Sequence, residues 1–232
     1  MSAPLGRVAG LTTWAVKSMG GGRVHDRVAA DETGLAGDRR YALVDQRPDR
    51  LGAVVSARSV PGVLRWSADP GSAEPRLAGP DGRTWSWSDP ALPGALADDL
   101  GVPVGLSHDD GGHADLPRSV LVTTAASHRA VEGQTGRRLE PARWRTNLHL
   151  DLDAPAYAED AWEGRRLVVG DVVLRLLHPC QRCTIPTYAP GGLRRDPALL
   201  RFFAAERKGP FGINARVEVP GVLEAGAPVV LD

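Results

Sequence analysis

Lysine and cysteine are nearly absent from this chain of 232 residues. Lys17 and Lys208 are the only lysines, so arginine supplies almost all of the positive charge. Because GC-rich coding by itself favours arginine, the arginine excess has no functional weight on its own. The scarcity of lysine does, however, single out Lys17.

The chain also lacks an excess of charge of either sign, with 28 Lys and Arg residues against 28 Asp and Glu residues. This balance excludes a disordered acidic chain and a uniformly basic nucleic-acid coat, and we predict no nucleic-acid partner. Hydrophobic residues make up 42% of the chain, which is enough for one sizeable core or two small adjoining ones. The composition indicates a soluble globular protein.

Long apolar runs are missing as well. No stretch approaches the roughly 18 consecutive apolar residues of a membrane span. The first fourteen residues are too polar, and their apolar part is too short, for a secretory signal. We therefore predict no membrane association and a cytoplasmic location.

The two cysteines, Cys180 and Cys183, are too few and too close for a disulfide framework. A close pair of this kind is typical of a redox dithiol, of part of a zinc site or of a single thiolate metal ligand. It is also compatible with two small buried hydrophobic residues. Arg182 between them argues against that last interpretation, because a neighbouring guanidinium favours the thiolate.

Zinc and dithiol chemistry each lack a feature that they need. A structural zinc site takes four ligands, whereas His178 and the two cysteines supply three, with His149 as a distant fourth. A redox dithiol should open a helix that lowers the thiol pKa, yet Pro186 follows the pair closely and disfavours a helix beginning there. A single-thiolate ligand is the interpretation that needs neither feature.

Basic and amide side chains gather at residues 143–147, just before a predicted strand. In extended chain, Arg143, Arg145 and Asn147 would project to one face. Guanidinium groups bind phosphate through paired hydrogen bonds, so this face suits an anionic ligand, although a solvated strand face is the alternative. Residues 17–22 have a lysine and a glycine run, but they lack the spacing of a phosphate-binding loop.

The pattern along the chain is that of a mainly β protein with two or three helices. Short apolar runs predict strands at residues 7–14, 41–45, 53–56, 84–87, 119–123, 148–151, 167–169, 172–177 and 228–231. Gly170 and Asp171 predict a two-residue hairpin turn. Asp196 and the proline after it predict the start of a helix that ends near Lys208, and weaker helices are expected at 89–100 and 124–133.

Two polar stretches, at residues 68–82 and 107–117, interrupt the apolar pattern. We place a domain boundary at the second stretch. This divides the chain into a β-rich part at residues 1–106 and a part at residues 107–232 that holds both cysteines.

Six short motifs occur in an order that resembles the MOSC family, named for the C-terminal domain of molybdenum cofactor sulfurase. They lie at residues 14–18 (WAVKS), 34–39 (GLAGDR), 56–58 (SAR), 143–147 (RWRTN), 162–171 and 179–183 (PCQRC). The order is most similar to the branch with an N-terminal MOSC β-barrel domain, which includes the amidoxime reducing component and its bacterial relatives. Thr146 and Arg40 depart from the family pattern, which usually has proline and an apolar residue there.

The resemblance implies a MOSC-type β-barrel with an N-terminal β-rich subdomain that binds a molybdenum cofactor, a Mo-molybdopterin. It further implies that Cys183 is the molybdenum ligand and the catalytic residue. The residues that the resemblance assigns to cofactor binding are Lys17, Ser18, Arg39, Thr124, Ser127, Arg145, Asn147, Cys180 and Arg182. Thr124 and Ser127 are expected on the lip opposite the basic residues.

Two function classes follow from the resemblance, a reductase of small N-hydroxylated substrates and a cofactor carrier or sulfur-transfer protein. A zinc-binding module that uses His178 and the two cysteines is the third alternative. The chain has too few thiols for an iron–sulfur cluster and no motif for a flavin, nicotinamide or haem. A reductase would therefore take electrons from a separate donor, either a ferredoxin-like protein or a flavin reductase.

Overall fold

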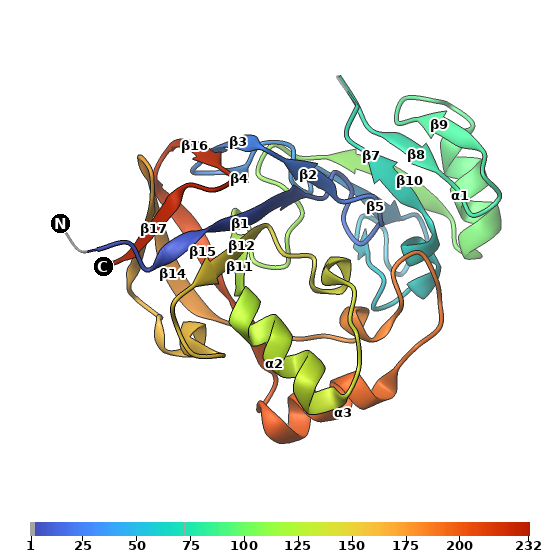
Figure 1. The fold of residues 1–232 in the computed structure, drawn as a ribbon. Helices are drawn as coiled ribbons and strands as arrows, with labels where there is room; N and C mark the ends of the chain where they lie inside the picture. Colours follow the sequence, from blue (N-terminus) through green and yellow to red (C-terminus); the bar gives the residue numbers. More distant parts are fainter. Residues whose placement is uncertain (1–2, 72) are drawn as a thin grey trace.

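The computed structural model describes residues 3–71 and 73–232. In this part of the chain, strands dominate and three α-helices, α1 to α3, lie among them. Figure 1 shows two β-rich parts, a barrel beside α2 and α3 and a group of small sheets beside α1. The prediction of a mainly β fold with a few helices is confirmed.

Seven strands close into a barrel. The ring runs through β12 (Leu148–Leu152), β11 (Val120–Thr124), β15 (Pro210–Val219), β14 (Val172–Gln181), β13 (Arg166–Val169), β17 (Pro228–Leu231) and β1 (Gly6–Thr13), and returns to β12. β1 closes the ring by pairing with β12 from Gly6 opposite Leu152 to Leu11 opposite Leu148. A closed ring leaves none of its seven strands as an open edge, and β2 (Arg23–His25) extends it beside β1.

The alternation of side chains along β12 shows how the sequence builds this barrel. Leu148, Leu150 and Leu152 are buried in the barrel core, whereas His149 and Asp151 are only partly buried on the opposite face. The hairpin turn predicted at residues 170 and 171 joins β13 to β14. The period of two therefore places a leucine row inside and leaves His149 outside the barrel.

The second part of the molecule has its own apolar core. One small sheet contains β5 (Tyr41–Asp45), β6 (Val54–Val55) and β10 (Val104–His108), and another contains β7 (Ser67–Asp69), β8 (Arg76–Ala78) and β9 (Thr84–Ser86). α1 (Leu92–Leu100) and the short 3-10 helix η1 (Pro61–Arg65) pack against them. Leu43, Trp66 and Leu92 lie in this core.

Strands from both sides of the predicted boundary at residues 106 and 107 share sheets. β1 completes the barrel, and β3 (Arg27–Asp31), which also pairs with β4 (Gly34–Leu35), pairs with β16 (Gly221–Glu224). Leu5 donates a backbone hydrogen bond to Val229 at 2.7 Å, so the described ends of the chain lie side by side (Figure 1). The division of the chain into two domains at residues 106 and 107 therefore stays a prediction.

Local side-chain hydrogen bonds mark where the helices begin. The side chain of Asp196 accepts a hydrogen bond from the Ala198 amide and starts α3 (Pro197–Glu206), as predicted. Thr124 likewise starts α2 (Ala125–Thr135). The predicted helix at residues 89–100 begins only at Leu92, because the Asp89 carboxylate is used in a turn with Ala91. In the described residues, no helix is both long and apolar enough to cross a membrane.

Several strands lie outside the predicted ranges, and one local expectation is wrong. Residues 210–219, not predicted as a strand, form β15, the longest partner of β14. The segment before β12 is not extended, because residues 141–144 form the 3-10 helix η2 (Pro141–Trp144) and Arg145 has a positive φ of 53°. The predicted row of Arg143, Arg145 and Asn147 on one strand face is therefore absent.

The glycine run after Lys17 has a packing role. A Cβ on Gly21 would lie 2.6 Å from the Ala68 carbonyl oxygen, and one on Gly22 would lie 2.7 Å from the Trp14 ring. Side chains at either position would collide with backbone or with a buried ring. Glycine is needed here so that the chain after β1 can lie against the second part of the molecule.

Candidate functional site

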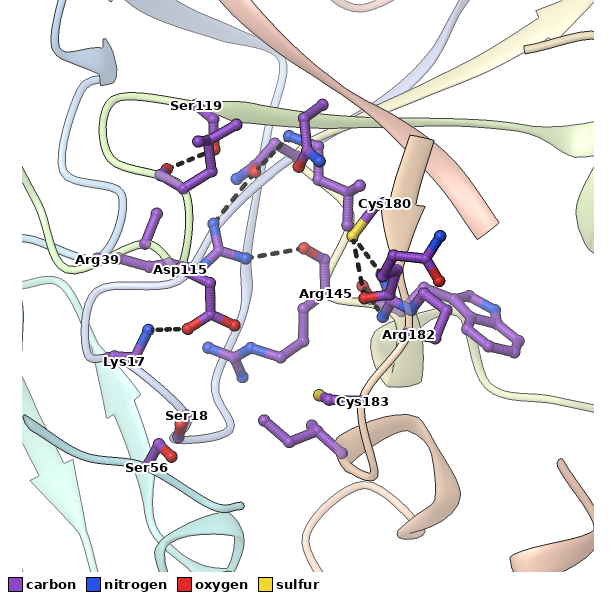
Figure 2. A pocket seen from close by; sticks show the side chains of 18 of the residues that line it. Lys17, Ser18, Arg39, Ser56, Asp115, Ser119, Arg145, Cys180, Arg182 and Cys183 are labelled. Atoms are coloured by element: carbon purple, nitrogen blue, oxygen red, sulfur yellow. Dashed lines mark hydrogen bonds and ion pairs between the residues drawn. The ribbon is translucent and has the colours of Figure 1, made fainter. Parts of the chain in front are cut away.

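A pocket of about 110 Å³ opens between the cysteine segment and the loops that follow β1, β4, β6 and β10. We call it the Cys183 pocket. Its polar lining consists of Lys17, Ser18, Arg39, Ser56, Arg58, Asp115, Ser119, Arg145, Asn147, Cys180, Gln181, Arg182, Cys183 and Asn214. Figure 2 shows Lys17 and Arg39 on one side and the two cysteines with Arg182 on the other, with Arg145 between them.

Lys17 lies on the wall that the loop after β1 provides. Its Nζ donates to Asp115 Oδ1 and to the His113 carbonyl oxygen, both at 2.6 Å. Burial lowers the pKa of Lys17, although the hydrogen bond with Asp115 opposes that shift. Arg58 donates to the same carboxylate at 2.9 Å. One acidic residue therefore faces two cations here.

Arg39 has an αL backbone, with a φ of 50°, and also lines the pocket. Its guanidinium pairs with Asp38, donates to Asn147 Oδ1 at 3.1 Å and donates to the Arg145 carbonyl oxygen at 2.9 Å. Asn147 is buried, and its Oδ1 also accepts from the Leu121 amide. Asn147 thus anchors Arg39 to β11, which fixes the guanidinium beside the pocket.

Arg145 is a partly buried cation. Its guanidinium donates to the carbonyl oxygen of Met19 and lies 4.3 Å from the centre of the Trp14 ring. Among the described residues it forms no ion pair with a carboxylate. Burial lowers the pKa of Arg145 to about 9, so the group stays protonated at neutral pH. A partly buried charge with this environment favours an anionic ligand.

The cysteines differ in their contacts. Cys180 lies near the end of β14, and Arg182 donates to its Sγ at 3.5 Å and to the Trp144 carbonyl oxygen at 3.0 Å. Cys183 lies beyond the strand, before the 3-10 helix η4 (Ile185–Thr187), and its sulfur faces the Arg145 side of the pocket in Figure 2. Both are free thiols. Only Cys180 is held by a side-chain donor.

Comparison with known proteins decides the family. The sequence pattern of the MOSC domain matches residues 109–230, more than half of the chain. The chain belongs to the MOSC domain family. The same residues include β11, β12 and the cysteine segment, so the family region supplies the cysteine side of the Cys183 pocket.

Two relatives of this MOSC protein, one from human and one from mouse, are both named mitochondrial amidoxime-reducing component 1. The human protein is 28% identical over 127 residues and the mouse protein is 31% identical over 124 residues. Each match covers 48% of this chain and only 36% of the relative. The YuaD protein of Bacillus subtilis has a similar fold, with a TM-score of 0.52 and 15% identity over 97% of this chain and 94% of that one.

The structure of the MOSC protein brings most of the predicted site residues together. Lys17, Ser18, Arg39, Arg145, Asn147, Cys180, Arg182 and Cys183 all line the Cys183 pocket. Arg143 does not, because η2 turns it away. Its guanidinium instead pairs with Glu140 and donates to the Tyr188 carbonyl oxygen at 2.8 Å.

Thr124 and Ser127 do not reach the pocket, which corrects the expectation that they form its opposite lip. Thr124 accepts from the Ser127 amide at the start of α2. The Ser127 hydroxyl donates to Glu159 at 2.8 Å and accepts from the Tyr157 amide. We call these four residues the Glu159 cluster. Both hydroxyls are buried and engaged there, so they are not available to a ligand in the pocket.

The zinc alternative finds no support in the geometry. In the described part of the chain, no three His, Cys, Asp or Glu side chains are grouped as metal ligands. His178 Nδ1 contacts the carbonyl oxygen of Pro179, 3.2 Å away. His178 is also absent from the pocket lining, so it does not form a site with the two cysteines.

Sequence reasoning assigned no role to Ser56, Arg58 or Asp115, which also line the pocket. A signal existed for the first two, since residues 56–58 form one of the six ordered motifs. Asp115 lies in the polar stretch that predicted a domain boundary, and nothing in its local sequence marks it. Its role depends on the fold, which brings it to Lys17 from 98 positions away.

Proposed function

We propose that this MOSC protein binds a molybdenum cofactor in the Cys183 pocket and reduces N-hydroxylated compounds. Electrons would come from a separate ferredoxin-like protein or flavin reductase. The observation that supports this best is a free thiol, Cys183, in the same pocket as the partly buried cation of Arg145, which forms no ion pair with a carboxylate among the described residues. A soft thiolate suits a soft, redox-active metal, and a guanidinium suits a phosphate.

The charges of the pocket fit a phosphate-bearing cofactor. Five basic side chains line it, from Lys17, Arg39, Arg58, Arg145 and Arg182, whereas Asp115 is the only acidic side chain in the lining. The buried Nε of Arg182 has no hydrogen-bond partner in the described residues. A donor without a partner and an excess of positive charge would both be satisfied by an anion.

Each residue then has a physical task. Lys17, Ser18 and Arg39 would bind the phosphate-bearing end of the cofactor, and Arg145 would hold its charge from the floor of the pocket. Cys183 would ligate the metal, since its thiol has no side-chain donor of the kind that Cys180 has. Arg182 would orient Cys180 against the Trp144 backbone. Asp115 would release Lys17 and Arg58 when the phosphate enters.

The bound cofactor would supply two-electron oxygen-atom transfer, chemistry that protein side chains lack. Overall, an N-hydroxylated compound, two electrons and two protons give the amine or amidine and water. The relatives named for amidoxime reduction support this substrate class, although the match to them spans about half of this chain. The protein itself would bind and orient the reactants.

Metal and pterin analysis tests cofactor binding. Protein purified from a host that makes the cofactor should contain about one molybdenum per chain and release a fluorescent pterin after oxidation. Stoichiometric zinc without molybdenum would contradict the proposal.

A turnover assay tests the reaction. Loaded protein should reduce benzamidoxime with a reduced viologen, or with a ferredoxin and its reductase, and should be inactive with NADH alone. Robust NADH-dependent turnover by the isolated chain would contradict the need for a separate electron donor.

A cofactor carrier or sulfur-transfer protein is the second candidate, because it would need the same thiol and the same anion site. Full molybdenum loading without turnover under any reductant would favour this candidate over the reductase.

A further inference from the structure

A second and larger cavity adjoins the Cys183 pocket. Its volume is about 480 Å³, and Arg145, Asn147 and Ile185 line both cavities. The outer face of β1, the glycine run, the Trp66 segment and residues 185–191 form its walls. This volume lies within the range of roughly 300–1,000 Å³ typical of sites for small organic ligands.

The walls of this second cavity are mainly apolar and partly aromatic. Trp14, Leu64, Trp66, Ile185 and Tyr188 all contribute to them. Planar ligands suit such walls, because aromatic rings gain from edge and face contacts in addition to the burial of apolar area.

The charged groups in the lining are all engaged. Arg65 pairs with Asp99, and Arg143 pairs with Glu140. Arg145 donates to the Met19 carbonyl oxygen and lies against the Trp14 ring. Among the described residues, no acidic side chain lines the cavity. A cation would meet only positive groups here. An anion would find Arg65 and Arg143 already neutralised, and the Arg145 guanidinium donates instead to the Met19 carbonyl oxygen beside the Cys183 pocket.

Two histidines give the cavity a hydrogen-bonding edge. The rings of His128 and His149 lie 4.5 Å apart, and both bond to Thr123 Oγ1, through His128 Nε2 at 2.9 Å and His149 Nδ1 at 3.1 Å. Burial lowers the pKa of both histidines, so both rings are neutral at neutral pH. The other nitrogen of each ring has no hydrogen-bond partner among the described residues.

The number of available hydrogen atoms limits which hydrogen bonds the two imidazole rings can form with a ligand. The Thr123 hydroxyl has one hydrogen and can donate to only one of the two rings, so at least one ring must donate to it. A neutral imidazole that donates through one nitrogen accepts through the other. At least one ring nitrogen is therefore an acceptor for a ligand N–H. The second ring offers either a donor or another acceptor.

We infer that the second cavity is a binding site for an uncharged planar aromatic compound with a hydrogen-bonding edge such as a carboxamide. The aromatic ring lies among the apolar walls, and the amide group faces His128 and His149. This inference goes beyond the proposed function and does not depend on it, because it requires no metal, cofactor or turnover.

Three probes of nearly the same shape and different charge test the inference by calorimetry at neutral pH. They are 2-naphthamide, which is neutral, 2-naphthoate, an anion, and 2-naphthamidine, a cation. The amide should bind one molecule per chain and bind about tenfold more tightly than either charged probe, a difference of about 1.4 kcal/mol. Equal or tighter binding of a charged probe would overturn the inference.

A cavity-filling variant locates the site. Gly10 lies opposite His149 in the β1–β12 pairing, so side chains at the two positions share a face. A Cβ at Gly10 meets only His149 Cβ, at 3.9 Å, which is ordinary contact. Gly10→Leu should therefore fold and fill the cavity, reducing amide affinity by about tenfold or more. Gly133→Leu, on the exposed side of α2, is the matched control and should bind as the wild type does.

A second variant tests the hydrogen-bonding edge independently. His149→Phe keeps a ring of similar shape and removes the nitrogen, so it should weaken 2-naphthamide by about three- to tenfold. Unchanged affinity in both Gly10→Leu and His149→Phe would overturn the assignment of the site. The cofactor-loaded protein should bind the amide as the cofactor-free protein does. Loss of binding on loading would show instead that the second cavity belongs to the cofactor site.

Discussion

The Cys183 pocket and the Glu159 cluster each hold an ionisable side chain that forms no ion pair among the described residues. These side chains are Arg145 and Glu159. In the pocket, the partly buried guanidinium of Arg145 lies against backbone carbonyl oxygens and the Trp14 ring. In the cluster, Glu159 is buried against the hydroxyls of Thr124 and Ser127, and its Oε1 has no partner in the described residues. Arg145 adjoins a cavity, whereas Glu159 is fully enclosed.

The two sites differ in how the charge of the ionisable side chain can be neutralised. Guanidinium cannot easily lose its proton, so Arg145 keeps a positive charge that an incoming anion can neutralise. A carboxylic acid can keep its proton, and burial raises the pKa of Glu159 accordingly. The first site is therefore suited to binding, and the second is suited to holding the start of α2.

The largest expected effect tests the thiol of the pocket. Cys183→Ser should lower molybdenum content and turnover by about a hundredfold or more, because a hydroxyl is a poor substitute for a soft ligand. Cys180→Ser, the matched control, should retain measurable turnover. Metal analysis and benzamidoxime reduction measure both effects. Equal loss in the two variants would contradict the assignment of Cys183 as the one metal ligand.

The next largest effect tests the basic side chains of Arg145 and Lys17 in the Cys183 pocket. Arg145→Ala or Lys17→Ala should reduce cofactor occupancy, since removing one partner of a desolvated charge pair costs about 2–5 kcal/mol. Molybdenum and pterin content of purified variants measures this loss, and thermal unfolding shows whether the apoprotein is still folded. Normal occupancy in both variants would show that these positions do not bind the cofactor.

The Glu159 cluster gives a pH-dependent effect of intermediate size. Because the folded-state pKa of Glu159 lies above its ordinary value of 4.5, the folded chain holds the proton more tightly than the unfolded chain. The free energy of unfolding should therefore fall as pH rises from 4.5 through the folded-state pKa. Glu159→Gln, which cannot ionise, should lack this component.

Chemical denaturation of wild type and Glu159→Gln at several pH values measures the Glu159 effect. The variant should gain stability relative to wild type as the pH rises through this window. A constant difference between the two proteins would contradict a raised pKa for the buried Glu159.

The smallest effect marks the limit of the pocket. Arg194 and Arg195 follow the cysteine segment but are exposed and do not line the Cys183 pocket. Arg194→Ala should change cofactor content by less than about twofold, as surface substitutions usually have small effects. A loss as large as that of Arg145→Ala would extend the anion site beyond the pocket described here.

The amino-acid sequence by itself determined the local elements and the type of chemistry. A short apolar run predicted β12, and Asp196 followed by proline predicted the start of α3. The ordered motifs predicted the family and eight of the residues that line the Cys183 pocket. These features can be predicted from the sequence because each depends on residues that are close together in the chain.

Only the tertiary structure decided which polar groups are available to a ligand. Thr124 and Ser127 are used by α2 and Glu159, η2 turns Arg143 away, and the barrel brings Asp115 to Lys17. The second cavity likewise exists only because β1 and β12 pair and set Gly10 opposite His149. Hydrogen bonds and burial between distant segments fix these outcomes, and a short stretch of sequence does not contain them.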